Sequence, residues 1–62
     1  MTEPRFICDC GWQDKAYNSA RLMFAAQVHL RQQHHKWPAK ADLILNPSKW
    51  GVRFINFDPR QV

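Results

Sequence analysis

Cysteine is scarce in this sequence, since only Cys8 and Cys10 occur among 62 residues. Small secreted domains held by disulfides usually carry four or more cysteines, and a disulfide between these two would close a loop too small to add much stability. Long apolar runs are lacking too, so we expect no membrane-spanning segment. No apolar stretch follows Met1. We therefore expect no secretory signal and an intracellular protein, in the cytoplasm or in the nucleus or nucleoid.

The chain is also short, and it is expected to form a single domain, residues 1–62. A chain of this size buries only about 60% of the surface that its unfolded form exposes, so its apolar core is marginal. Hydrophobic residues nevertheless make up 45% of the sequence, and aromatic residues 13%, which excludes an ordinary disordered chain. The composition predicts a folded domain that needs a further source of stability, such as a metal ion, disulfides or a partner.

Cysteine and histidine together form a metal-ligand pattern. Cys8, Cys10, His29 and His34 read as C-x-C-x18-H-x4-H, and His35 is the alternative fourth ligand. Two thiolates and two imidazoles suit a tetrahedral Zn²⁺ ion. In an extended strand both cysteine sulfurs point to the same side, toward one ion. The alternative interpretation is that the histidines are solvated helix residues and the cysteines are small core residues.

The run from Phe6 to Trp12, followed by a helical segment that ends in two histidines, resembles a Cys-Cys-His-His zinc finger over about residues 6–36. Phe6, two residues before the first cysteine, matches the aromatic position of that family. The spacing is atypical, with one residue between the cysteines and eighteen before His29. The resemblance implies a β-hairpin packed on a helix around one structural zinc.

The sequence predicts a small α+β domain. Residues 5–9 read as a short strand and residues 11–18 as a polar connection. Residues 19–36 lack glycine and proline and are rich in helix formers, so they predict one long helix with Asn18 or Ser19 as its N-cap. The remaining apolar runs predict a C-terminal β-hairpin over about residues 42–57, with strands at 42–46 and 50–57 around a turn that contains Pro47.

The predicted helix has two apolar faces. At 100° per residue, one stripe lies between the two histidines and is expected to pack beneath the metal site; it consists of Leu22, Met23, Ala26 and Leu30. Phe24 and Val28 lie on the opposite side. They are either covered by the predicted hairpin or exposed as a docking patch. Trp37 and Trp50 are further candidates for docking a protein partner.

Charge is unevenly distributed along the chain. Residues 15–41 contain five basic residues and no acidic one, which are Lys15, Arg21, Arg31, Lys36 and Lys40. Such a segment is typical either of contacts to nucleic-acid phosphates or of a solvated surface. In base-reading zinc fingers, helix positions −1, 3 and 6 touch the bases, and here these positions hold Leu22, Ala25 and Val28. Because none of these residues can hydrogen-bond a base edge specifically, sequence-specific reading is not expected.

Two functions are therefore expected for this zinc-binding module. The first is binding of nucleic acid through the phosphate backbone, with Arg31, Lys36 and Lys40 as the favoured contacts. The second is docking on a protein partner through apolar helix and hairpin surfaces. No enzymatic activity is expected, because four protein ligands leave a zinc ion no open position for water or substrate. Neither a membrane nor a small-molecule substrate is expected as a partner.

Overall fold

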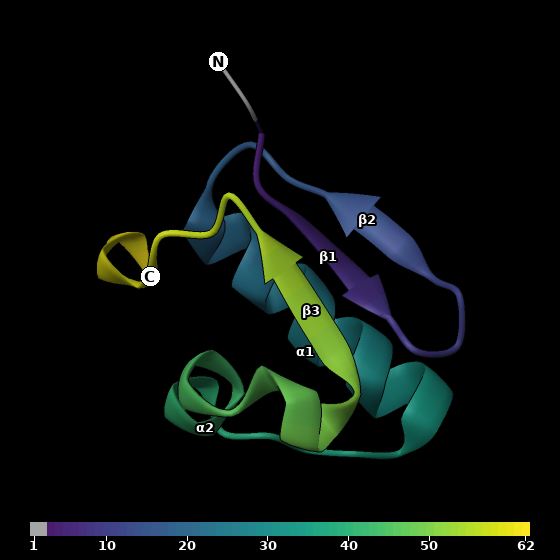
Figure 1. Ribbon diagram of the computed structural model, residues 1–62. Helices are drawn as coiled ribbons and strands as arrows, with labels where there is room; N and C mark the ends of the chain where they lie inside the picture. The colour runs from purple at the N-terminus through teal and green to yellow at the C-terminus, as the bar shows by residue number, and fades with distance from the viewer. Residues whose placement is uncertain (1–2) are drawn as a thin grey trace.

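The computed structural model describes residues 3–62 and contains a three-stranded sheet, one long helix and several short helical segments (Figure 1). In chain order the elements are β1 (Arg5–Cys8), β2 (Gln13–Lys15), α1 (Ser19–His34), α2 (Lys40–Leu45), the 3-10 helix η1 (Pro47–Trp50), β3 (Val52–Ile55) and the 3-10 helix η2 (Pro59–Gln61). The predicted α+β class is thus confirmed. None of the helices in residues 3–62 is long and apolar enough to cross a membrane.

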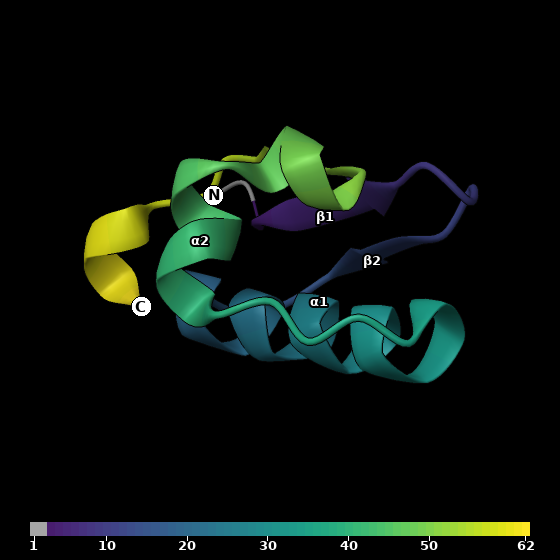
Figure 2. The same cartoon turned by 90° about the horizontal axis from the view of Figure 1, so that it is seen from below.

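The sheet has the strand order β2-β1-β3, and both pairings are antiparallel. Phe6 on the central strand lies opposite Asp14 of β2 and Phe54 of β3. Side chains alternate along a strand, so Phe6 and Cys8 point to one face and Arg5 and Ile7 to the other. Helix α1 covers the first face: it lies behind the sheet in Figure 1 and below it in Figure 2.

Helix α1 begins where the sequence predicts. The side chain of Asn18 accepts a hydrogen bond from the backbone N–H of Arg21 (2.8 Å), which caps the first turn. The predicted end at residue 36 is wrong by two residues, because His35 adopts a left-handed conformation (φ 55°) and ends the helix after His34. The backbone N–H of Lys36 also bonds to the carbonyl of Leu30 (3.1 Å), a bond that closes the C-terminal end of the helix.

The core lies between α1 and the sheet. All four residues of the predicted helix stripe, Leu22, Met23, Ala26 and Leu30, are fully buried. They pack with Phe6, Cys8, Val52 and Leu43, the last of which comes from α2. This is one continuous hydrophobic cluster, so the short chain builds a core by drawing on the sheet and both helices.

The predicted C-terminal hairpin is wrong in its first half. Residues 42–46 do not form a strand, because they fall largely within helix α2, whose Leu43 is buried in the core. Alanine and leucine favour a helix here, and the helix satisfies the backbone hydrogen bonds locally. The predicted second strand exists as β3, but it pairs with β1. It is shorter than residues 50–57, since Gly51 (φ 73°) and Asn56 (φ 57°) flank it with left-handed conformations.

The predicted connection over residues 11–18 contains a further strand, β2. This strand is polar and lies at the edge of the sheet, where its residues pair with Arg5, Phe6 and Ile7. It turns the N-terminal segment into a β-hairpin that stands over α1. That hairpin and α1 together position the cysteines and histidines.

Candidate metal centre

The hairpin loop between β1 and β2 carries both cysteines. Cys8 is the last residue of β1, and Cys10 lies in the turn that follows. The backbone N–H of Gly11 donates to the carbonyl of Cys8 (2.9 Å), and the N–H of Cys8 donates to the carbonyl of Trp12 (2.7 Å). Gly11 has φ 94°, which side-chain-bearing residues adopt rarely. A tight turn, and not the extended strand expected from the spacing, therefore brings the second sulfur back toward the first.

The loop is anchored from the C-terminal half of the chain. The backbone N–H of Asp9 donates to the carbonyl of Gly51 (2.8 Å). A methyl group added to Gly51 would lie 3.1 Å from the Asp9 carboxylate, so the two segments approach closely. Strand β3 thereby supports the cysteine loop as well as the sheet.

Both histidine ligands come from the last turns of α1. Ideal helix geometry separates residues 29 and 34 by about 140°, so their rings converge only if the helix end loosens. The end is loosened here, because the backbone N–H of His35 bonds to the carbonyl of Leu30, five residues back. The two imidazole rings meet edge to face with their centroids 5.1 Å apart.

The four ligand atoms lie within 4.8 Å of one another. Cys8 Sγ is 3.4 Å from His34 Nε2, and Cys10 Sγ is 3.4 Å from His29 Nε2. Around a tetrahedral zinc, with Zn–S of about 2.3 Å and Zn–N of about 2.0 Å, neighbouring ligand atoms are roughly 3.3–3.8 Å apart. These four residues could thus hold a metal ion with little rearrangement.

His35, the alternative fourth ligand, lies outside this group. Its side chain is exposed, and its left-handed backbone forms the cap of α1. The structure therefore brings together Cys8, Cys10, His29 and His34. His35 instead caps the C-terminal end of α1.

Burial shifts the pKa of two of the candidate ligands, His29 and Cys8. The pKa of His29 is lowered from its ordinary value, first by burial and second by the neighbouring His34, which favours the neutral imidazole that metals bind. The pKa of the Cys8 thiol is raised, chiefly by burial. A hydrogen bond from the backbone of Cys10 lowers this pKa, whereas the side chains of Cys10 and Asp9 raise it further. A metal ion must therefore displace protons from the thiols, so its affinity depends on pH.

Aromatic rings enclose His29. The indole of Trp12 stacks on the imidazole at a centroid distance of 5.2 Å and an interplanar angle of 12°. Phe6 lies on the same ring with a centroid distance of 5.9 Å and a tilt of 54°. No role for Trp12 is predicted from the sequence, in which its only signal is its position two residues after Cys10. This stacking holds the imidazole in a fixed orientation.

The predicted nucleic-acid contacts are not brought to one place. Arg21, Arg31, Lys36 and Lys40 are exposed, while Lys15 lies 3.8 Å from the carboxylate of Glu3. Arg21 and Arg31 stand about 15 Å apart along α1, given a rise of about 1.5 Å per residue. These cations are spread over two helices and the segment between them.

Among the predicted docking residues, Trp37 and Phe24 are exposed, by 66% and 68%. Val28 and Trp50 are half-buried, and the Trp50 indole donates a hydrogen bond to Asp42 (2.9 Å). The expectation that a hairpin covers Phe24 is therefore wrong, because residues 42–46 lie in a helix instead.

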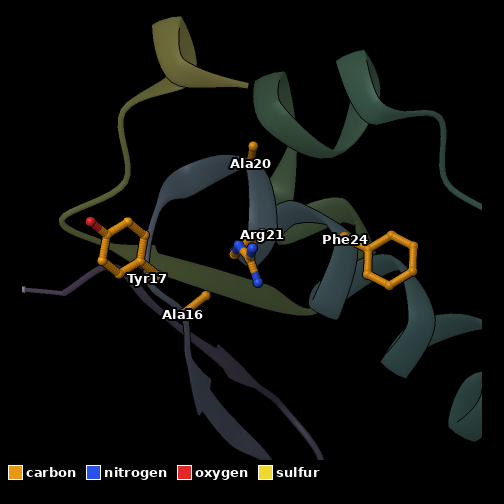
Figure 3. A pocket seen from close by; sticks show the side chains of 5 residues that line it. All are labelled: Ala16, Tyr17, Ala20, Arg21 and Phe24. Atoms are coloured by element: carbon orange, nitrogen blue, oxygen red, sulfur yellow. The ribbon is translucent and has the colours of Figure 1, made fainter.

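Phe24 borders a shallow groove of about 500 Å³ at the start of α1. Tyr17 and Phe24 stand at its two ends with Arg21 between them, and Ala16 and Ala20 complete the lining (Figure 3). Tyr17 is 87% exposed. The groove combines two accessible aromatic rings with one cation.

Comparison with known proteins finds no matching family model, no matching curated protein and no matching solved structure. The resemblance to a Cys-Cys-His-His zinc finger rests on the ligand set and on the hairpin and helix that carry it. That geometry supports a metal-binding module of four cysteine and histidine ligands.

Proposed function

We propose that this chain is a small module whose fold is held by one structural zinc ion and which binds nucleic acid through the phosphate backbone. The donor set supports zinc, because two thiolates and two imidazoles whose ligand atoms lie within 4.8 Å of one another match its preferences. Four protein ligands complete the coordination of that ion. A catalytic zinc keeps one position for water or substrate, so the proposed role is structural and not enzymatic.

The observation that carries the nucleic-acid proposal is a surplus of unpaired cations. Three of the nine basic residues form ion pairs within residues 3–62: Lys15 with Glu3, Lys49 with Asp42, and Arg60 with Asp58. The other six basic side chains have no acidic partner within 4.0 Å in that range, and they are Arg5, Arg21, Arg31, Lys36, Lys40 and Arg53. All six are exposed. Exposed cations without partners attract polyanions and release the counterions of their phosphates.

Base reading is not part of the proposal. Leu22 is fully buried, and Ala25 and Val28 are half-buried, so the three positions that touch bases in zinc fingers present no polar groups. The proposed contacts therefore go to phosphates, and affinity is expected to vary little with base sequence.

The salt dependence of binding tests this function. The zinc-loaded protein is titrated with a labelled DNA duplex between ~50 and ~200 mM salt, and the logarithm of the binding constant is plotted against that of the salt concentration. A negative slope of several units, equal for unrelated sequences, is expected. A flat plot, or no binding at low salt, contradicts the proposal.

The groove between Tyr17 and Phe24 favours a second function, docking of a protein partner. Two exposed aromatic rings, one just before α1 and one on it, offer apolar area that a partner side chain could cover. This function predicts that a protein partner is recovered with the chain in one-to-one ratio after nuclease treatment. Phe24→Ser is expected to abolish the recovery, and Trp37→Ser is expected to leave it unchanged. Equal recovery with both variants argues against the groove.

A further inference from the structure

Within residues 3–62, one face of the sheet is left uncovered. Helix α1 covers the face that carries Phe6 and Cys8, and the opposite face is turned toward the viewer in Figure 1. Strand alternation places six side chains on this open face, and they are Arg5, Ile7, Gln13, Lys15, Arg53 and Ile55. Five are exposed and Ile7 is half-buried.

Three of these six side chains are cations that lie on neighbouring strands. Arg5 is paired directly with Lys15 in the β1–β2 register, so their Cβ atoms are about 5 Å apart. On the other side Arg5 is paired with Ile55, which makes Arg53 a diagonal neighbour at about 7–8 Å. Arg5, on the central strand, therefore lies within about one Debye length of physiological salt, about 8 Å, of both Lys15 and Arg53.

Little negative charge balances them. The carboxylate of Glu3 is 3.8 Å from Lys15, and that of Asp14 accepts the backbone N–H of Lys15 from the other side of the strand. Arg5 and Arg53 have no acidic partner within 4.0 Å among residues 3–62. Like charges directly opposite in a sheet destabilise it, so this arrangement is unfavourable until an anion covers it.

We propose that the open sheet face of Arg5, Lys15 and Arg53 is the surface on which the phosphate backbone of a nucleic-acid duplex binds. This inference rests on the proposed function and assigns its site. The sheet concentrates three cations in one patch, whereas the cations of α1 and α2 are spread out. Arg5 and Arg53 could not be predicted as part of this site from the sequence, because only the strand register brings them near Lys15.

The other side chains of the face decide between a duplex and a single strand. Proteins that bind single strands add aromatic platforms on which bases stack. The six residues of the open face include no aromatic one; Ile7 and Ile55 are aliphatic, and Gln13 can donate to a phosphate oxygen. The face thus suits a duplex, in which the bases stay stacked with each other and the phosphates are outside.

Two triple variants with the same change in charge test the site. One carries Arg5→Gln, Lys15→Gln and Arg53→Gln on the sheet, and the control carries Arg31→Gln, Lys36→Gln and Lys40→Gln. Each phosphate contact contributes about 0.9 to the slope of binding against salt, which corresponds to about fivefold in affinity at 0.15 M salt. The sheet variant is expected to lose about three units of slope, and the control, whose three cations lie outside the sheet, is expected to lose clearly less. Equal losses in the two variants would overturn the assignment of the sheet face.

The possible results separate the site from the function. If the control loses the slope and the sheet variant keeps it, the assigned face is wrong and the proposed function stands. If the wild-type protein binds duplexes with no salt dependence, both are wrong. The wild-type protein could instead prefer single-stranded nucleic acid, an acidic protein or vesicles with anionic lipid. If the sheet variant abolishes that binding, the face binds polyanions, but the proposal that it binds a duplex is wrong.

Stability provides a second readout. Since Arg5 faces Lys15, the change Arg5→Gln removes a repulsion and is expected to leave the thermal midpoint unchanged or to raise it. Loss of binding without loss of stability supports a binding surface. A fall in stability equal to that of a core substitution would show that these side chains act in the fold, and it would overturn the proposal.

Discussion

His34 and His35 are adjacent in the chain, but only His34 turns its ring toward the cysteines. We therefore expect His34→Ala to weaken zinc binding by more than the roughly 10- to 100-fold that loss of an outer hydrogen-bond partner costs. His35→Asn is the matched control, because asparagine tolerates the left-handed conformation of that position. Competition with a chromogenic chelator measures both affinities. A control variant that loses zinc as strongly as His34→Ala would contradict this ligand set.

Trp12 acts on the metal site through the imidazole of His29. An aromatic pair of this kind contributes about 0.5–1.5 kcal/mol beyond the area it buries. Trp12→Ala is therefore expected to lower zinc affinity by about 2- to 12-fold, measured by the same competition. Trp37→Ala removes the same side chain at an exposed position away from the site and is expected to change nothing. Equal effects of the two substitutions would argue against the stacking role.

The chemistry of single residues explains how much of the candidate site could be predicted from the sequence. Cysteine and histidine are rare enough that their spacing selected Cys8, Cys10 and His29 and reduced the fourth ligand to His34 or His35. Spacing could not separate His34 from His35, because the choice depends on a left-handed residue at the helix end. It also could not find Trp12, whose stacking follows from the turn at Gly11.

Among the elements, α2 and η1 are held together by one carboxylate. Asp42 accepts hydrogen bonds from Asn46 (3.2 Å), Trp50 (2.9 Å) and Lys49 (3.3 Å). The bond from Asn46 lowers the pKa of Asp42 most, followed by that from Trp50. A carboxyl whose pKa is lowered by folding stabilises the fold above its ordinary pKa, and this effect is lost as pH falls through the lowered value.

We accordingly expect Asp42→Asn to lower the urea midpoint at neutral pH. The difference from the wild-type protein should stay constant down to pH ~5 and narrow only below about pH 4, where the carboxyl becomes protonated. Asp14→Asn is the control, because this carboxylate accepts only the adjacent backbone N–H of Lys15 among residues 3–62. A difference that disappears already between pH 7 and 5 would mean that another group is responsible.

Helices and strands could be predicted where the local sequence pattern determines the secondary structure, and not where pairing with a distant strand determines it. Helix α1 followed from its composition and its apolar stripe. The apolar run at residues 43–45 is compatible with a strand or a helix, and short apolar runs do not settle that choice. The outcome depended on β3 pairing with β1, which lies more than forty residues earlier in the chain. Strand β2 was missed because its three residues are polar and lie at an edge.

For the molecule as a whole, the proposed metal ion is expected to supply much of the stability. Among residues 3–62, the buried core contains eight hydrophobic residues, one of which, Cys8, is also a candidate ligand. A structural zinc can contribute on the order of 10 kcal/mol to the folding of such a domain. Removal of the metal with a chelator is therefore expected to abolish the cooperative thermal transition seen by circular dichroism, and added zinc is expected to restore it. A metal-free sample, verified by elemental analysis, that still melts cooperatively would contradict a structural role.

All four ligands lie within residues 8–34, whereas β3 comes from the end of the chain. During synthesis on a ribosome the ligand set is therefore complete before the third strand has been made. Until that strand emerges, one edge of β1 remains open to other chains. Zinc uptake by a stalled nascent chain, detected as protection of Cys8 and Cys10 from alkylation, would show that the ion is acquired at this early stage.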